Sequence, residues 1–274
     1  MTQPLLSRGA WKEAEAALDA ATVRRPALVV FDFDGTLAPI VMSPDRVRVP
    51  AETMRAIEEA ARLPRVRIAA LSARPMRDLA RYLPVRRVLR VAQYGLEGGD
   101  GPGAERRRRI ASGVKALREL LTPIASSWRG TWIEDKRLTI ALHYRRVSAP
   151  RRGALLRALA RVVSRARRLG FHPEPGRMVL DFVPSGYDKG RALRMLANRV
   201  RPAVLFYFGD TAGDEPAFAA LGRSGFAVRV GPGPTKAPYR VRGPRDVARF
   251  LRAIAARGAA GPRRTGDSNE EVSR

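Results

Sequence analysis

Two carboxylates stand at the end of an apolar run, where a buried strand would finish. Residues 27–33 read ALVVFDF, and Asp32 and Asp34 flank the last phenylalanine, just before Gly35 and Thr36. Side chains two residues apart on a strand share a face, and open α/β sheets bind ligands at the carboxyl ends of their strands. Two like charges held close in a low dielectric need a cation, a shared proton or a lysine nearby. The pair therefore indicates a ligand or metal site at this edge.

Three further segments place polar side chains where a strand ends or a helix begins. The run LFYFGD ends in Asp210, with Asp214 one turn further on; DKG places Lys189 at a helix start; ALS ends in Ser72. Each feature alone is most simply a helix cap or a solvated lysine. All of them in one chain, each in the expected structural context, favour one shared site.

The elements that must position these residues alternate between apolar runs and helical patterns. The runs that we predict as strands span residues 24–33, 66–72, 87–95, 203–210 and 225–230. The patterns that we predict as helices span residues 8–21, 50–63, 75–82, 188–199, 214–221 and 244–257. Continuous apolar strands suit a parallel sheet covered on both faces, and the alternation predicts a doubly wound, Rossmann-like α/β core.

The order changes in the middle of the chain. A glycine-rich hinge candidate at 97–109 comes first, and a helix at 107–128, strands at 131–135 and 138–145, a helix at 150–169 and a strand at 177–183 follow it. This order predicts an inserted α+β cap. We expect the core at 1–97 and 185–260, the cap at 98–184, and a disordered tail at 261–274, where apolar residues are almost absent.

The bulk composition limits the classes of function. A chain of 274 residues with 45% hydrophobic content can bury a full core and a smaller second one. The absence of cysteine excludes disulfides, thiolate metal sites and a cysteine nucleophile. No run approaches the roughly 18 apolar residues of a membrane helix, and the N-terminus lacks a leader pattern. We therefore expect a cytoplasmic protein without a membrane partner.

The formal net charge of +26 raises the question of a nucleic-acid partner. Only five of the 52 basic residues are lysine, and the arginines are spread from end to end. No nucleic-acid-binding motif accompanies them, so we interpret the charge as a general preference for arginine and expect no nucleic-acid partner. A positive field still attracts anions, and we expect a monomer that acts on a small anionic molecule.

The segments DFDGTL, LSAR, DKG and GDTAGDE resemble the four motifs of the haloacid dehalogenase superfamily of phosphohydrolases. The resemblance implies that Asp32 attacks phosphorus and forms an aspartyl-phosphate, while Asp34 protonates the leaving oxygen and then activates water. It also implies Mg²⁺, bound by Asp32, the backbone carbonyl of Asp34 and Asp210. Asp214 would join this metal site through a water or by orienting Asp210.

The same resemblance implies a cradle for the phosphoryl group. Lys189 would offset the charge on the nucleophile and the phosphate, and Ser72 would contact the phosphoryl oxygens. Backbone N–H groups near Gly35 and Thr36 would complete the cradle, and Arg74, which ends the LSAR motif, would lie with them at the substrate.

The predicted cap carries a second resemblance. The segment WIEDKRLTIALHYR at 132–145 resembles the Glu-Asp-Lys and His-Tyr-Arg signature in the cap of trehalose-6-phosphate phosphatases, and the likeness extends over residues 27–255. It implies a lid that binds trehalose 6-phosphate and excludes water from the phosphoryl centre. The residues expected to contact the sugar are Glu134, Lys136, His143, Arg145, Arg177 and Asp181.

Several positions depart from the pattern of that family. Tyr94 stands where a histidine is common, and the fourth motif has Thr211 and Gly213 in place of Asp and Thr. In the cap, Arg177 replaces a lysine and Asp181 replaces a glutamate, which changes donor geometry and shortens the reach. These departures remove no catalytic group, but they bear on the choice of sugar.

Three alternatives remain open at the level of sequence. A related capped phosphatase could act on glucosyl- or mannosyl-3-phosphoglycerate or on sucrose phosphate. A sugar phosphomutase shares the aspartate pair but normally has a helical cap inserted directly after the first motif. An inactive, basic binding protein on this scaffold would hold nucleic acid in a salt-sensitive manner without phosphatase activity.

Overall fold

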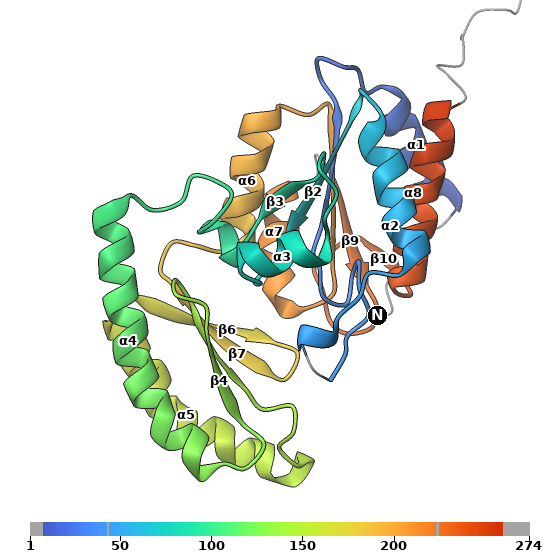
Figure 1. Ribbon diagram of the computed structural model, residues 1–274. Coiled ribbons are helices and arrows are strands. Elements are labelled where there is room, and N and C mark those ends of the chain that lie inside the picture. The colour runs from blue at the N-terminus through green and yellow to red at the C-terminus, as the bar shows by residue number, and fades with distance from the viewer. Residues whose placement is uncertain (1–7, 43, 223–224, 260–274) are drawn as a thin grey trace, which may run out of the picture.

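The sheet that carries the predicted site has six parallel strands. A computed structural model describes residues 8–42, 44–222 and 225–259. The strand order is β10-β9-β8-β1-β2-β3, and every neighbouring pair is parallel (Figure 1). The strands are β1 (Ala27–Phe31), β2 (Val66–Leu71), β3 (Leu89–Val91), β8 (Val204–Gly209), β9 (Phe226–Val230) and β10 (Tyr239–Val241).

Helices cover both faces of this sheet, which explains why its central strands are continuously apolar. In β1, Val29 and Phe31 pack toward one face and Leu28 and Val30 toward the other, and all four are fully buried. The first face is covered by α1 (Arg8–Asp19), α2 (Ala51–Arg62), α3 (Met76–Tyr82) and α8 (Pro244–Ala259). The second face is covered by α6 (Lys189–Val200) and α7 (Glu215–Leu221).

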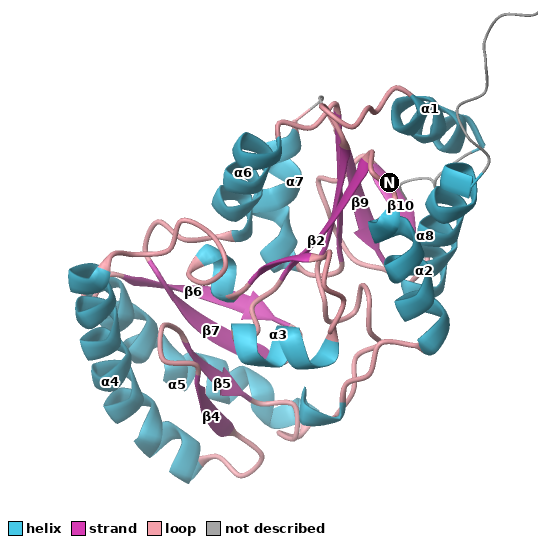
Figure 2. Ribbon diagram, turned by 45° about the horizontal axis from the view of Figure 1, so that its top comes forward, coloured by secondary structure: helices cyan, strands magenta, loops and turns pink. Residues whose placement is uncertain are grey.

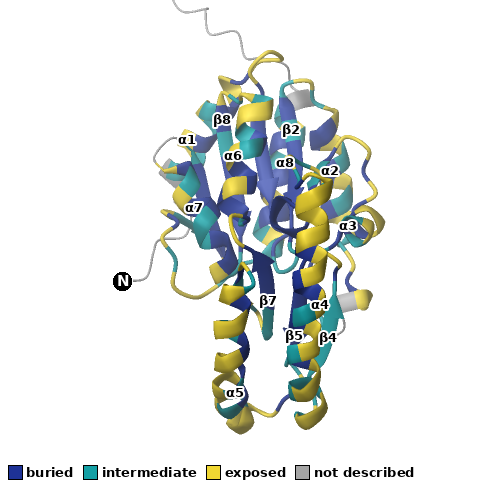
Figure 3. Ribbon diagram, turned by 90° about the vertical axis from the view of Figure 1, so that its left-hand side faces the viewer, coloured by how far each residue is buried: buried dark blue, intermediate teal, exposed yellow. Residues whose placement is uncertain are grey.

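A second, antiparallel sheet with its own core forms the inserted cap. Its strand order is β4-β5-β7-β6, with β4 (Trp132–Asp135), β5 (Ile140–His143), β6 (Phe171–Gly176) and β7 (Val179–Pro184). One face packs on α4 (Ala104–Ser127) and α5 (Ala149–Arg168), and the sheet lies between these helices and the core (Figure 2). Figure 3 shows that the exposed residues of this part follow the outer faces of α4 and α5. On this basis we propose residues 98–184 as the cap domain.

The predicted α/β core with an inserted α+β cap is confirmed, and the differences from prediction concern three strands. The strand predicted at 87–95 ends at Val91, because the chain then turns through a short 3-10 helix, η2 (Gln93–Gly95). Strand β6 was not predicted: it contains Pro173 and Pro175, which a sheet tolerates at an edge, and β6 is an edge strand. The short edge strand β10 was not predicted either.

Two further expectations from the sequence concern the C-terminal tail and membrane-spanning helices. The tail at 261–274 lies outside the described residues. Within the described ranges, no helix has the length and apolar character needed to cross a membrane.

The remaining short helices are η1 (Pro44–Arg46) and η3 (Ala212–Asp214), and the second of these borders the site.

Candidate active site

Asp32, Lys189 and Asp214 meet at the carboxyl edge of the parallel sheet. Asp32 follows β1, Lys189 is the first residue of α6 and Asp214 ends η3. The Lys189 Nζ atom lies 2.9 Å from Asp32 Oδ1 and 2.7 Å from Asp214 Oδ1. All three side chains are buried. The lysine that the charge argument required is therefore present, and it bridges two carboxylates.

Asp214 is held more firmly than any sequence pattern indicated. Besides Lys189, the hydroxyl of Tyr207 (2.7 Å), the backbone N–H of Thr211 (2.9 Å) and the hydroxyl of Thr211 (3.0 Å) donate to its carboxylate. Burial alone would raise the pKa of Asp214, but Lys189 and these donors outweigh it and lower that pKa. With both oxygens in use, Asp214 is suited to orient Lys189 and the η3 turn.

Asp210, which follows β8, differs from Asp214 because one of its oxygens is unused. Oδ1 is buried and has no hydrogen-bond partner among the described residues. Burial and the charge of Asp214 raise the pKa of Asp210 to about 6. Carboxylate oxygens of Asp32, Asp210 and Asp214 all lie within 4.8 Å of one another. Clustered carboxylates with an unused oxygen fit a divalent cation that prefers oxygen ligands.

Burial and neighbouring carboxylates also raise the pKa of Asp32. Burial is the largest cause, the charges of Asp214 and Asp210 add to it, and Lys189 opposes it, so the pKa stands well above its ordinary value. A divalent cation at this cluster would favour the ionised carboxylates and reverse that direction. The donor set and its electrostatics therefore suit a bound metal ion.

The turn after Asp34 commits one of the backbone N–H groups expected at the phosphate and leaves a side-chain hydroxyl without a partner among the described residues. Thr36 is fully buried, and its Oγ1 has no hydrogen-bond partner in the described part of the chain. The N–H of Gly35, by contrast, donates to the carbonyl of Ala38 at 2.7 Å, so the amide expected at the phosphate is committed to the turn. Gly35 is needed for another reason: its φ is +82°, and a Cβ there would overlap the carboxylate of Asp210.

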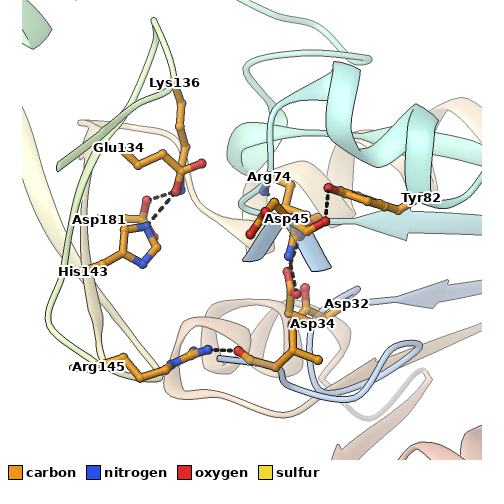
Figure 4. Close-up of polar contacts among 12 residues, drawn as sticks. Asp32, Asp34, Asp45, Arg74, Tyr82, Glu134, Lys136, His143, Arg145 and Asp181 are labelled. Atoms are coloured by element: carbon orange, nitrogen blue, oxygen red, sulfur yellow. Dashed lines mark hydrogen bonds and ion pairs between the residues drawn. The ribbon is translucent and has the colours of Figure 1, made fainter. Parts of the chain in front are cut away.

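Asp34 is paired with Arg74. The guanidinium donates from Nε to Asp34 Oδ2 at 2.7 Å and from Nη2 to Asp34 Oδ1 at 2.8 Å, a bidentate contact (Figure 4). The same guanidinium lies over the rings of Phe33 and Tyr82. The N–H of Arg74 donates to the hydroxyl of buried Ser72 at 3.2 Å. Arg74, expected at the substrate, is thus also the partner of the proposed acid.

Four of the six residues expected to contact the sugar form two hydrogen-bonded pairs on the cap sheet. Glu134 on β4 accepts from His143 Nε2 at 2.7 Å, and Asp181 on β7 accepts from Lys136 Nζ at 2.6 Å (Figure 4). Burial would raise the pKa of Glu134, but the His143 hydrogen bond and the Lys136 charge lower it to about 2. The ring of His143 also stacks on Trp132, with centroids 4.5 Å apart.

Three contacts tie the cap to the core beside these pairs. The hydroxyl of Tyr94 donates to Asp181 Oδ2 at 3.3 Å, and the hydroxyl of Thr139 donates to the side chain of Gln93 at 2.9 Å. The guanidinium of Arg145 donates to the backbone carbonyl of Val41. Sequence comparison with the family singled out Tyr94 by its identity, but no signal indicated the other contacts.

One cavity, with a volume of about 140 Å³, lies between the core and the cap. The predicted residues that line it are Asp32, Asp34, Ser72, Arg74, Glu134, Lys136, His143, Arg145, Arg177, Asp181 and Lys189. Gly35 and Asp210 line an adjoining cavity of about 590 Å³, which the exposed Arg177 also borders. The proposed nucleophile and the proposed sugar contacts therefore line one cavity.

Sequence reasoning missed two residues of the site. Tyr207, inside the apolar run of β8, orients Asp214. Arg229 is a buried cation on β9, and its Nε and Nη1 have no hydrogen-bond partner among residues whose positions are described. Burial lowers the pKa of Arg229, while Asp210 and Asp214 raise it. An arginine inside the apolar run FAVRV was the available signal.

Comparison with known proteins shows the family to which the chain belongs. The trehalose-phosphatase family profile matches residues 30–245. The chain belongs to this family. A trehalose-phosphate phosphatase of Mycobacterium marinum is 32% identical over 254 residues, which cover 87% of this chain and 63% of that protein. A bifunctional trehalose-6-phosphate synthase/phosphatase of Thermoproteus tenax is 30% identical, covering 82% of this chain and 32% of its own length. The chain thus spans less than two thirds of these relatives.

Solved structures share the fold. The C-terminal domain of a Candida albicans trehalose-6-phosphate phosphatase superposes with a TM-score of 0.81 at 20% identity, covering 93% of this chain and 98% of that one. A haloacid dehalogenase-like hydrolase of Bacteroides thetaiotaomicron superposes with a TM-score of 0.58 at 14% identity, covering 84% of this chain and all of that one. The resemblance to the trehalose-phosphatase family is confirmed by the family match, and the fold is shared with a haloacid dehalogenase-like hydrolase.

Proposed function

We propose that this protein is a phosphomonoester hydrolase that removes the phosphate group of trehalose 6-phosphate and depends on Mg²⁺. One observation carries the proposal: a buried aspartate paired with a lysine and a set of charged cap residues line the same cavity. Family membership supports the reaction class. The match to part of the mycobacterial phosphatase and the Glu134, Lys136 and Asp181 set support the sugar.

The first half of the reaction would transfer the phosphoryl group to Asp32. Its carboxylate attacks phosphorus, a P–O bond forms, and the bond from phosphorus to the sugar oxygen breaks. Asp34 donates a proton to that departing oxygen. Lys189, held by Asp214, lies beside the nucleophile and offsets the negative charge of the transferring group.

In the second half, Asp34 as a carboxylate takes a proton from water, the water oxygen bonds to phosphorus, and the P–O bond to Asp32 breaks. The bidentate contact with Arg74 holds the Asp34 carboxylate in place, which suits this half. As the proton donor of the first half, Asp34 would use one of the same oxygens, so the contact must loosen. Arg74 would then be able to turn toward the substrate.

Mg²⁺ would be held by Asp32, Asp210 and the backbone carbonyl of Asp34, and when bound it supplies positive charge against the phosphoryl oxygens. The unused buried oxygen of Asp210 supports this assignment. Asp214 would act through the groups that it orients, because Lys189, Tyr207 and Thr211 already use its oxygens.

The leaving group would be recognised by the cap. Glu134 and Asp181 offer acceptors, Lys136 and Arg177 offer donors, and sugar hydroxyls need both. The buried side chains of Lys136, His143 and Asp181 would keep water out of the space in which the phosphoryl group is transferred.

Phosphate release from a panel of sugar phosphates tests the proposal. We expect the highest kcat/KM for trehalose 6-phosphate, activity with Mg²⁺, and none with chelator. Asp32→Asn keeps the shape of the nucleophile but not its charge, and we expect it to lose activity by at least about a thousandfold. A preference for sucrose phosphate or a glycosyl-3-phosphoglycerate would contradict the substrate alone. Full activity of Asp32→Asn would contradict the covalent route.

A further inference from the structure

Tyr94 reaches from the core into the charged cluster of the cap. Its hydroxyl lies 3.3 Å from Asp181 Oδ2, and the other oxygen, Oδ1, lies 2.6 Å from Lys136 Nζ. The exposed fractions of these three residues are 4%, 3% and 7%, so no bulk water competes for the contacts. Among the described residues, the Asp181 carboxylate accepts one hydrogen bond from Lys136 of the cap and one from Tyr94 of the core.

The backbone fixes Tyr94 to the catalytic edge of the sheet. Gln93 and Tyr94 have φ values of +46° and +59°, a left-handed conformation that is unfavourable for residues with side chains. The N–H of Tyr94 donates to the carbonyl of Ser72, and the N–H of Gln93 donates to the carbonyl of Arg74. Such backbone persists only where its surroundings hold it, and it is frequent at functional sites. The phenol is therefore placed by the LSAR segment.

The electrostatics keep this phenol a hydrogen-bond donor. Burial raises the pKa of Tyr94 well above its ordinary value, and the charges of Asp181, Glu174 and Asp32 raise it further. A neutral hydroxyl can donate a hydrogen bond to Asp181. Tyr94 and the proposed nucleophile Asp32 also line the same cavity.

The lengths of the two side chains match the gap between core and cap. Tyrosine is a long side chain on the core side, and aspartate is a short one on the cap side. Their polar ends meet at 3.3 Å beside the cavity, so a change in the length of either one would break the contact.

We propose that Tyr94 and Asp181 form a coupled pair in which Tyr94 is a positioning residue that aims the Asp181 carboxylate, and with it Lys136, at the sugar hydroxyls. The pair joins core to cap, so it forms only when the cap is closed over the cavity. This inference rests on the proposed function as a sugar-phosphate phosphatase and adds the residue that adjusts its selectivity.

Tyr94→Phe removes the hydroxyl and keeps the ring. A hydrogen bond to a charged group is worth enough that we expect KM for the preferred sugar phosphate to rise about tenfold, with kcat within about twofold. The ratio of kcat/KM for that substrate to kcat/KM for p-nitrophenyl phosphate should fall by about the same factor, since the aryl ester has no sugar to position. Tyr239→Phe is the matched control, because its hydroxyl donates to Glu13 at 3.4 Å, away from the cavity.

A double-mutant cycle decides whether the two positions are coupled. Tyr94→His and Asp181→Glu each break the length match, and we expect each to lower kcat/KM for the sugar phosphate by about tenfold. The double variant should regain most of that loss. Losses that multiply in the double variant, or a Tyr94→Phe loss equal for both substrates, would overturn the inference. The cycle is measured on whichever panel sugar phosphate the wild type prefers, so a wrong sugar contradicts only the proposed substrate.

Discussion

The variant Asp210→Asn, which lacks the Asp210 charge, should be more stable than the wild type in the absence of metal, and it should have no activity. Burial and neighbouring Asp214 raise the pKa of Asp210 from an ordinary value of 3.8 to about 6. The folded state therefore binds this proton more tightly than the unfolded chain does. Its contribution to stability is fully present below pH 4 and is lost as the pH rises through about 6.

The size of the effect follows from that difference in pKa. One pKa unit corresponds to about 1.36 kcal/mol, so ionised Asp210 costs the metal-free fold about 3 kcal/mol at pH 8. Asp210→Asn removes the charge and nearly keeps the shape. We expect an unfolding free energy higher by about 1 to 3 kcal/mol, because the amide must find its own partners.

The assay is denaturant unfolding in chelator over pH 4 to 8. The wild type should lose stability relative to Asp210→Asn as the pH rises, and the gap should level off above pH 7. Saturating Mg²⁺ should reverse the order, since it binds the wild-type cluster in the folded state only. Asp100→Asn, at an exposed carboxylate, serves as the control and should change stability by less than about 0.5 kcal/mol.

Two results would refute this reasoning. A gap that does not vary with pH would mean that Asp210 carries no ionisation cost. An Asp210→Asn protein less stable than the wild type at pH 8 in chelator would mean that the carboxylate stabilises the fold without metal, for example by pairing with Arg229.

Two further predictions concern the same edge of the sheet. Gly35→Ala places a Cβ into the Asp210 carboxylate at a φ of +82°, so we expect loss of at least about 2 kcal/mol of stability and weaker Mg²⁺ binding, measured by unfolding and calorimetry. Arg74→Lys replaces a bidentate contact to Asp34 with a point charge, so we expect kcat, measured by phosphate release, to fall about tenfold. An unchanged kcat would contradict a role for this contact in placing the acid.

The sequence was sufficient for the fold and for the catalytic edge, and the reason is periodicity. Continuous apolar strands that end in polar residues gave the parallel sheet, and strand ends in a parallel sheet meet at one edge. Asp32, Lys189 and Asp214 were therefore expected together, and they lie within hydrogen-bonding distance. Strand β6 was not predicted because its two prolines disfavour a strand, except at the edge of a sheet, and the sequence does not show that β6 lies at an edge.

The contacts between core and cap could not be predicted in the same way. Tyr94 and Asp181 are 87 residues apart, and their meeting depends on how the cap is seated. Gln93 meets Thr139 for the same reason. The commitment of the Gly35 amide to Ala38 depends on the φ of one turn residue. A periodic pattern of apolar residues predicts helices and strands, but it does not specify an individual side-chain contact or dihedral angle.

The two ends of the cavity use one arrangement for different purposes. At each end a buried lysine lies between two carboxylates: Lys189 between Asp32 and Asp214, and Lys136 between Asp181 and Glu134. The core end keeps an unused carboxylate oxygen nearby, so it can take up a cation without breaking any contact.

At the cap end, both oxygens of Asp181 already accept hydrogen bonds, Oδ1 from Lys136 and Oδ2 from Tyr94. A sugar hydroxyl that binds Asp181 must therefore share or replace an existing contact. The exchange costs little binding free energy when the ligand replaces every hydrogen bond that it displaces. It costs much more when the ligand leaves a buried charged group without a partner. Selectivity should thus arise at the cap from mismatched hydroxyls, while the core end treats all phosphate monoesters alike.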